Sequence, residues 1–212
     1  MSIEEAQMIH QQRVSSLRVA LRNVPLTSPA LTLEIGCGHG HFLTAYAATR
    51  PDEQCVAIDI IKERLDKAAR KSTSAKLNNI TWLRAAADDF FEALPAEVRF
   101  TRHIFILFPD PWPKRKHWKN RLIQRPFLDT LARHTTLGTR LCFRTDHDPY
   151  FEQAAAEIRG HLAWQERSAA DWPFEQRTVF EARAPSHNSL VAERVGEAAP
   201  GDAGHLCATN RQ

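Results

Sequence analysis

The stretch Leu31 to Gly40, with the sequence LTLEIGCGHG, decides the fold of this chain. Its apolar first half is typical of a buried strand, and Glu34 stands at the end of that strand. Glycines at alternate positions follow, so the backbone can turn sharply and a ligand can approach main-chain atoms. Residues 41–48 have a helical pattern, so the turn brings a helix N-terminus to the same place. A strand, a glycine turn and a helix in this order predict a nucleotide-binding site.

The spacing of the glycines separates the possible ligands. The dinucleotide fingerprint Gly-x-Gly-x-x-Gly does not fit, because the third glycine comes one residue early, and this disfavours a nicotinamide-dependent oxidoreductase. Glu-x-Gly-x-Gly-x-Gly instead resembles motif I of class I S-adenosylmethionine methyltransferases. The resemblance implies that Glu34 attracts the cationic groups of the cofactor and that Gly36 and Gly38 line its site. The alternative without a ligand is a tight connection between strand and helix.

The composition is that of a globular protein. The chain has 212 residues, of which 43% are hydrophobic and 25% charged, which suits one domain. No apolar stretch is long enough to span a membrane, and the N-terminus lacks a signal-peptide pattern. The cysteines form no Cys-x-x-Cys pair, so we expect a reduced, cytoplasmic protein without a metal site. The net charge of +3 argues little for nucleic acid, and a monomer and a homodimer both remain open.

From residue 31 onward, apolar runs alternate with helical stretches, which predicts an α/β fold. We expect a Rossmann-like, mostly parallel seven-stranded sheet with helices on both faces. Strands are expected at Leu31–Ile35, Gln54–Asp59, Ile80–Arg84, His103–Phe108 and Arg140–Arg144. Helices are expected at His41–Ala48, Lys62–Lys71, Phe127–Arg133 and Asp148–Arg159. Residues 162–184 are expected to add two antiparallel strands, which carry Trp164 and Val179-Phe180.

The two ends of the chain differ from this central part. Residues 4–23 have a helical pattern with one apolar face, formed by Val14, Leu17 and Leu21. The last residues are small, polar and aperiodic, which indicates a mobile tail. We therefore expect an N-terminal helix and linker over 1–30, a globular domain over 31–191 and a mobile tail over 192–212.

The next two strands also end in residues suited to a nucleoside. Asp59 ends the second strand, where two ribose hydroxyls could donate to its carboxylate. The third strand runs into Arg84-Ala85-Ala86-Ala87-Asp88, and in this type of sheet an adenine edge rests against that strand end. The small side chains leave room for the ring, and the backbone N–H near Ala87 could meet it. Asp88 either accepts from the adenine amino group or caps the next helix.

The fourth strand leads into a loop with three prolines, Pro109-Asp110-Pro111-Trp112-Pro113. The prolines restrict this loop, so Asp110 is held at the carboxyl end of the sheet, where open α/β sheets bind ligands. A rigid carboxylate beside an aromatic ring can hold a planar base, because it accepts from ring N–H groups while the base stacks. The alternative is an acid in a proline turn without a ligand.

A basic segment follows the proline loop. Its six Lys or Arg side chains come without any acid and favour contacts with phosphates. They are Lys114, Arg115, Lys116, Lys119, Arg121 and Arg125. Trp112 and Trp118 lie between these charges and could stack on exposed bases, although Trp118 could equally anchor the loop.

The stretch from Phe108 to Gln124 resembles the signature of the bacterial tRNA (guanine-N7-)-methyltransferase family. The resemblance implies methyl transfer from S-adenosyl-L-methionine to N7 of a guanine in the variable loop of tRNA, with residues 31–191 as the methyltransferase domain. Glu34 and Asp59 would then bind the cofactor, and Asp110 would be the active-site acid. The implied substrate-binding residues are Lys114, Asp146, Thr178, Val179, Phe180 and Glu181.

The chain departs from the family at Ala86, where relatives usually have an acid or amide. This leaves open whether Asp88 replaces an adenine contact. One alternative is a methyltransferase for an exocyclic amine or another RNA, although Trp112 comes one residue early for that motif. The other alternative is an RNA-binding protein that has kept the fold and lost the activity.

Overall fold

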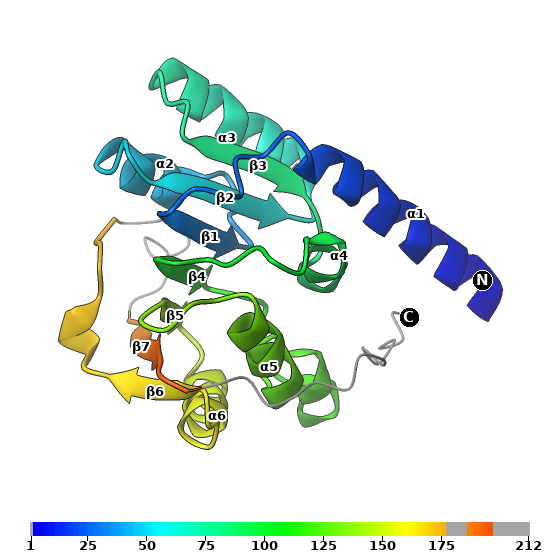
Figure 1. The fold of residues 1–212 in the computed structure, drawn as a ribbon. Helices are drawn as coiled ribbons and strands as arrows, with labels where there is room; N and C mark the ends of the chain where they lie inside the picture. The colour runs from blue at the N-terminus through cyan, green and yellow to red at the C-terminus, as the bar shows by residue number, and fades with distance from the viewer. Residues whose placement is uncertain (1, 177–185, 197–212) are drawn as a thin grey trace. The chain divides into compact units, whose positions relative to one another are not determined.

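The computed structural model describes residues 2–176 and 186–196 of the chain. These residues divide into two compact units, Met1–Arg102 and His103–Gln212, and each is described by itself. The described strands form a seven-stranded, mostly parallel sheet of the α/β class, as predicted (Figure 1). Within the first unit the strand order is β3-β2-β1, and within the second it is β4-β5-β7-β6.

The first unit contains three parallel strands, the two helices that connect them and one further helix on either side in the chain. The strands are β1 (Leu31–Ile35), β2 (Gln54–Asp59) and β3 (Ile80–Arg84), at the predicted positions. The helices are α1 (Ile3–Leu21), α2 (His41–Ala48), α3 (Lys62–Ser74) and α4 (Ala87–Ala93). Every residue of β1 is buried, and so is nearly every residue of β2, which accounts for their continuously apolar sequences.

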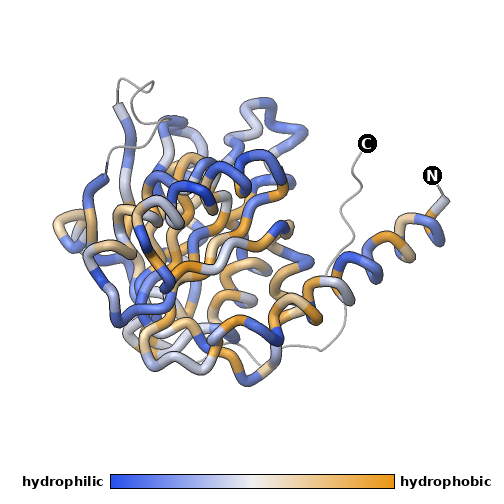
Figure 2. The backbone as a smooth tube through the Cα atoms, turned by 90° about the horizontal axis from the view of Figure 1, so that it is seen from above, coloured by the Kyte–Doolittle hydropathy of each residue, from blue (hydrophilic) through white to orange (hydrophobic). Residues whose placement is uncertain are grey.

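Helix α1 begins with a capping box, in which Ser2 Oγ accepts from the Glu5 N–H and Glu5 Oε2 accepts from the Ser2 N–H. The helix alternates hydrophilic and hydrophobic segments along its length (Figure 2). Its predicted apolar face is buried, at Val14, Leu17 and Leu21. Helix α1 packs against α4, so the N-terminal segment of the chain covers one side of α4.

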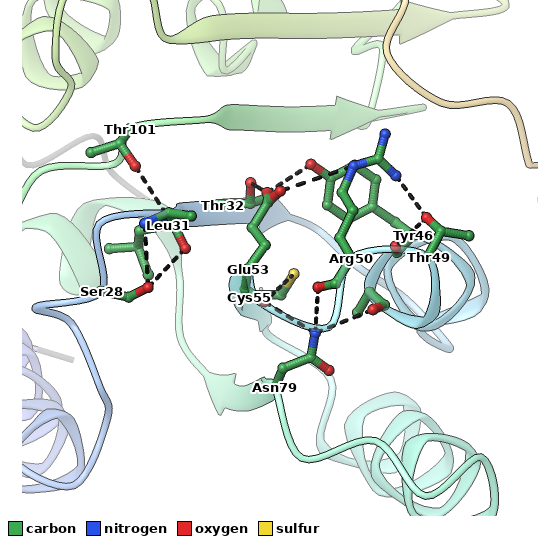
Figure 3. A network of polar contacts seen from close by, with 12 residues as sticks. Ser28, Leu31, Thr32, Tyr46, Thr49, Arg50, Glu53, Cys55, Asn79 and Thr101 are labelled. Atoms are coloured by element: carbon green, nitrogen blue, oxygen red, sulfur yellow. Dashed lines mark hydrogen bonds and ion pairs between the residues drawn. The ribbon is translucent and has the colours of Figure 1, made fainter.

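A buried polar network ties the turn before β2 to the amino end of β1 (Figure 3). Glu53 Oε1 accepts from the Tyr46 hydroxyl at 2.7 Å and from the Thr32 hydroxyl. The Arg50 guanidinium lies 4.2 Å from the centre of the Tyr46 ring, and its Nε is 3.9 Å from Glu53 Oε2. Asn79 Nδ2 donates to the carbonyl oxygens of Arg50 and Glu53 in the same turn and to that of Ala47 near the end of α2. These contacts hold the end of the sheet that lies opposite the glycine turn.

The second unit begins with two parallel strands and ends with two antiparallel ones. The strands are β4 (His103–Leu107), β5 (Arg140–Thr145), β6 (Trp164–Arg167) and β7 (Asn188–Arg194). The helices are α5 (Arg125–Arg133) and α6 (Asp148–Arg159), with the 3₁₀ helices η1 (Arg115–Asn120) and η2 (Ala169–Asp171). Helix α6 packs on β5, β6 and β7, and α5 packs on α6.

The last strand lies further along the chain than the sequence indicated. β6 contains Trp164, as predicted, but its antiparallel partner β7 starts only at Asn188. The strand expected at Val179-Phe180 lies outside the described residues. β7 continues to Arg194, past the expected start of the tail at 192, because the Arg194 N–H donates to the Thr139 carbonyl at 2.9 Å. Most of the expected tail, from 197 onward, also lies outside the described residues.

Three further features concern the described residues only. None of their helices combines the length and the apolar character that crossing a membrane requires. In the same part of the chain, no cluster of three or more His, Cys, Asp or Glu side chains is placed to hold a metal ion. The thiols of Cys37, Cys55 and Cys142 are free and buried, whereas Cys207 lies outside the described residues.

Candidate active site

The three glycines of the turn all have positive φ angles but differ in their surroundings. Gly36 has φ 77°, Gly38 has φ 53° and Gly40 has φ 65°. A Cβ on Gly40 would lie 2.6 Å from Ala68 Cβ and 2.6 Å from Trp82 Cη2, so this glycine permits packing against α3 and β3. A Cβ on Gly36 would meet nothing within 4 Å. The first glycine therefore leaves main-chain atoms accessible, and the third serves the packing of the protein itself.

Glu34 is buried at the end of β1, with 3% of its surface exposed. Its Oε2 atom is fully enclosed and has no hydrogen-bond partner in the described part of the chain. Burial, with a smaller contribution from the charge of Asp59, raises the pKa of Glu34 to about 8, although the Leu43 N–H opposes this shift. An unpaired buried carboxyl is costly. A cationic ligand at this position would supply the missing partner and favour the ionised form.

Asp59 ends β2 and is held by main-chain donors on both sides. Its Oδ2 accepts from the Gly38 N–H and its Oδ1 accepts from the Ile61 N–H, each at 2.8 Å. The Asp59 carboxylate is thus fixed against the glycine turn, and each of its oxygens keeps a second lone pair for a ligand hydroxyl. The structure thereby brings together four of the residues that the sequence predicted to bind a cofactor: Glu34, Gly36, Gly38 and Asp59.

Ala87 and Asp88, the remaining predicted cofactor residues, open helix α4 directly after β3. The Ala85 N–H donates to the Asp59 carbonyl at 3.1 Å, so this connection lies beside the end of β2. Asp88 is exposed in the first turn of α4, and the N-cap position belongs to Ala86, which has no side-chain donor or acceptor. Asp88 therefore does not occupy the N-cap position. Contact of Ala87 or Asp88 with adenine stays a prediction.

In the second unit, the proline loop has a strained backbone on both sides of Asp110. Phe108 has φ 50° and Trp112 has φ 45°, a left-handed conformation that bulky residues rarely adopt. The Phe108 N–H donates to the Arg144 carbonyl at 2.8 Å, which fixes the start of the loop to the end of β5. Asp110 itself is exposed. A restrained loop thus presents a carboxylate at its surface.

The basic segment is divided between surface and core. Five of the six cations are exposed, namely Lys114, Arg115, Lys116, Lys119 and Arg125. The prediction that all six are available to phosphates is wrong for Arg121, of which only 2% is exposed, because its guanidinium is packed between side chains of its own unit. Trp118 lies 4.2 Å from that guanidinium and so anchors the loop, whereas Trp112 is 37% exposed.

Asp146 comes directly after β5 and is exposed. Because β4 and β5 are parallel neighbours, the loops that carry Asp110 and Asp146 leave the same end of these strands. The structure thus groups Asp110, Lys114 and Asp146 within the second unit. The other predicted substrate residues, Thr178, Val179, Phe180 and Glu181, lie outside the described residues.

Sequence reasoning missed the role of Arg144 near the end of β5. This arginine is 4% exposed, and its two terminal nitrogens donate to Glu175 at 3.1 and 2.9 Å. It also lies 4.1 Å from the centre of the Trp172 ring, and its Nε donates to Ser189 Oγ at 2.8 Å. Arg144 therefore attaches the segment after β6 to β5 and β7. The only signal in the sequence was a charged residue inside an apolar strand.

The sequence matches known methyltransferases over most of its length. Residues 28–192 match a family model described as "Putative methyltransferase". A tRNA (guanine-N(7)-)-methyltransferase of Rhizobium etli is 34% identical over 167 residues, which are 76% of this chain and 71% of the relative. The enzyme of the same name from Syntrophotalea carbinolica is 33% identical over 158 residues, which are 69% of this chain and 68% of the relative.

Solved structures share the fold at lower sequence identity. TrmN from Thermus thermophilus superposes with a TM-score of 0.56 and 18% identity, over 86% of this chain and 48% of that one. An rRNA methylase from Streptococcus thermophilus superposes with a TM-score of 0.53 and 12% identity, over 89% of this chain and 95% of that one. These likenesses support the Rossmann-like fold alone.

Proposed function

The chain belongs to the tRNA (guanine-N7-)-methyltransferase family, and from this we propose that it transfers a methyl group from S-adenosyl-L-methionine to N7 of a guanine in the variable loop of tRNA. The observation that carries the proposal is the Glu34 carboxyl, which is buried beside the glycine turn with an unpartnered oxygen. A buried carboxyl without a cation is unfavourable for the free protein, whereas it suits a cofactor that bears a sulfonium and an ammonium group.

The residues of the first unit fit this cofactor. Glu34 offers a negative charge to its ammonium group, and the open face of Gly36 allows close approach to the main chain. Asp59 is held by main-chain N–H groups and has lone pairs left for two ribose hydroxyls. Ala87 and Asp88 are proposed to contact the adenine. When bound, the cofactor supplies an electrophilic methyl group.

The residues of the second unit are suited to a guanine and its phosphates. Asp110 is proposed to accept from the N1–H and N2–H₂ edge of the base, with Asp146 sharing this contact. Lys114, Arg115 and Lys119 are exposed and are proposed to contact phosphates of a tRNA whose target base is unstacked. Thr178, Val179, Phe180 and Glu181 are proposed to complete the substrate contacts.

This chemistry needs orientation more than proton transfer. N7 of guanine already has a lone pair, so no general base has to create the nucleophile. The displacement requires N7, the methyl carbon and the sulfur to be in line, and orientation of this kind contributes much of a catalytic rate. A carboxylate at Asp110 also offsets the positive charge that the purine gains. The restrained proline loop suits such a positioning role. A tRNA substrate also implies that the enzyme works in the cytoplasm.

The test is to incubate the protein with methyl-labelled S-adenosylmethionine and unmodified tRNA, digest the RNA and identify the labelled nucleoside. We expect 7-methylguanosine from the wild-type chain and its loss in Asp110→Ala. The matched control is Asp66→Ala, which removes an exposed carboxylate that pairs with Lys62 on α3 and should leave the product unchanged. Label on another nucleoside would overturn the proposed substrate. If Asp110→Ala forms product at the wild-type level, the proposed role of Asp110 in the active site would be refuted.

A further inference from the structure

The strained proline loop needs something to hold it. Left-handed conformations at residues with bulky side chains are strained and persist only when their surroundings enforce them. Phe108 and Trp112 flank Asp110 symmetrically, two residues away on either side. The Phe108 side is held by its main-chain hydrogen bond to β5. Pro111 and Pro113, on either side of Trp112, lack N–H groups, so their main chain can accept hydrogen bonds only through the carbonyl oxygens.

The guanidinium of Arg121 provides that contact. Arg121 Nε donates to the Pro111 carbonyl at 2.8 Å, directly before the strained Trp112. Its Nη1 donates to the Pro149 carbonyl at 3.1 Å and to Gln153 Oε1 at 3.0 Å, both in the first turns of α6. One side chain therefore holds the residue after Asp110 and a residue three positions after Asp146.

Aromatic rings fix the plane of this guanidinium. It lies 4.2 Å from the centre of the Trp118 ring and 4.9 Å from the centre of the Tyr150 ring. Tyr150 is itself fully buried, and its hydroxyl accepts from the Ile123 N–H at 3.1 Å. The Arg121 guanidinium is thus restrained in both position and orientation. A lysine has no planar group and could not make the same set of directed hydrogen bonds.

The charge of Arg121 has no counter-ion in the part of the chain that the structure describes. Its acceptors are carbonyl oxygens, its Nη2 is buried without a partner, and within residues 2–176 and 186–196 no carboxylate pairs with it. Burial accordingly lowers the pKa of this guanidinium from its ordinary value. An unpaired buried cation costs stability, so a role in stability alone would be met better by an apolar side chain. Geometry is what this arginine contributes.

We propose that Arg121 is a positioning residue that sets the placement of Asp110 relative to Asp146. It acts by holding the proline loop to the start of α6, and it contacts no substrate phosphate. The inference rests on the proposed function, because Asp110 and Asp146 are assigned to the guanine there. A displacement of a catalytic group by about 1 Å can lower a rate about 100-fold. Loss of the hydrogen bonds made by the Arg121 guanidinium should therefore lower the rate of methyl transfer and leave cofactor binding intact.

The experiment is single-turnover methylation of tRNA by Arg121→Lys at saturating cofactor and tRNA. We expect a rate constant that is about 10- to 100-fold lower, a wild-type amplitude, an unchanged cofactor Kd and an unchanged salt dependence of tRNA binding. Gln153→Ala removes one acceptor of the Arg121 guanidinium, together with the Gln153 Nε2 donation to the Ile123 carbonyl, and should lower the rate constant by a smaller factor. It keeps the proposal testable if Arg121→Lys does not fold. The control is Arg133→Lys, an exposed arginine at the end of α5, which should behave as wild type.

Three results would overturn the inference while the wild-type chain makes 7-methylguanosine. The first is a wild-type rate constant in both Arg121→Lys and Gln153→Ala. The second is a reduced amplitude with an unchanged rate constant, which would show that Arg121 serves folding alone. The third is weaker tRNA binding with a salt slope reduced by about one, which would make Arg121 a phosphate contact. A wild-type chain that makes no 7-methylguanosine would overturn the proposed function and this inference with it.

Discussion

Glu34 and Glu53 are both buried glutamates of the first unit, but only Glu34 has a carboxyl oxygen that finds no hydrogen-bond partner among the described residues. Glu53 precedes β2, is 8% exposed and accepts hydrogen bonds from Thr32 and Tyr46. Glu34 lies at the opposite end of the strands, is 3% exposed and keeps an oxygen without any partner in the described chain. Because buried carboxyls normally find partners within the protein, the difference supports the proposal that the cofactor supplies the partner of this oxygen.

The two ends of these strands therefore differ in how far their polar groups are satisfied, and the carboxyl end is the one proposed to bind the cofactor. At the amino end the contacts of Figure 3 satisfy the polar groups of the turn from within the chain. At the carboxyl end there is open space beside Gly36. Each carboxylate oxygen of Asp59 accepts one main-chain hydrogen bond and can accept another. Substitutions at the two glutamates should consequently affect different properties of the protein.

The largest effect is expected for cofactor binding by Glu34→Gln. The change keeps the shape of the side chain but removes the charge that would pair with the cofactor ammonium. Loss of one partner of a buried ion pair costs about 3–5 kcal/mol, so the Kd for S-adenosylmethionine should rise about 1,000-fold. Isothermal titration calorimetry measures this directly. Glu53→Gln is the control and should bind the cofactor with wild-type affinity; equal affinities in Glu34→Gln and wild type would refute the binding role of Glu34.

An intermediate effect is expected for the folding stability of Glu53→Gln. The substitution leaves the hydroxyls of Thr32 and Tyr46 with a neutral, imperfectly matched acceptor in a buried position. The free energy of unfolding should fall by about 2 kcal/mol. Urea denaturation in the absence of cofactor measures the change. A stability equal to that of the wild type would show that this network is dispensable, and the contrast between the two glutamates would then rest on Glu34 alone.

The smallest effect is expected in the pH dependence of stability. The pKa of Glu34 is raised from 4.5 to about 8 in the folded state, so folding favours its protonated form. The unfolded chain loses this proton near pH 4.5 and the folded chain only near pH 8; the stabilising contribution is thus complete below about pH 4.5 and is lost as the pH rises toward 8.

Between pH 6.5 and 8, the unfolding free energy of the cofactor-free wild type should therefore fall by about 1 to 2 kcal/mol relative to that of Glu34→Gln. Urea titrations at both pH values measure this difference. Parallel pH profiles of the two proteins would contradict the raised pKa. In the same pH range, cofactor binding should release a proton from wild type and none from Glu34→Gln, which calorimetry in two buffers can detect.

Local patterns were sufficient to predict much of this molecule. Strands β1, β2 and β3 lie where their apolar runs predicted them, and helices α2 and α6 match the predicted bounds. Buried parallel strands need continuous apolar sequence, and a glycine turn needs glycine, so these features are visible without distant contacts. The same reasoning placed Glu34, Asp59, Asp110 and Asp146 at strand ends.

Other features depend on partners that are far apart in the chain. β7 was missed because its residues are ordered by pairing with β5 and β6 and not by a distinctive local pattern. In the sequence, Arg121 cannot be distinguished from the other cations of the basic segment. Only the folded structure, with its contacts to Pro111, Pro149 and Gln153, shows that it is buried.

Local sequence thus established which chemical groups the chain carries and at which strand ends they stand, because backbone periodicity depends on neighbouring residues. It could not show which of these groups are already satisfied. Glu34 and Glu53 are the same residue type in similarly buried positions, and Gly36 and Gly40 belong to the same motif. Folding separates them, since hydrogen-bond partners such as Tyr46 and packing neighbours such as Trp82 are brought from elsewhere in the chain. A polar group left without such a partner marks the place that a ligand can complete.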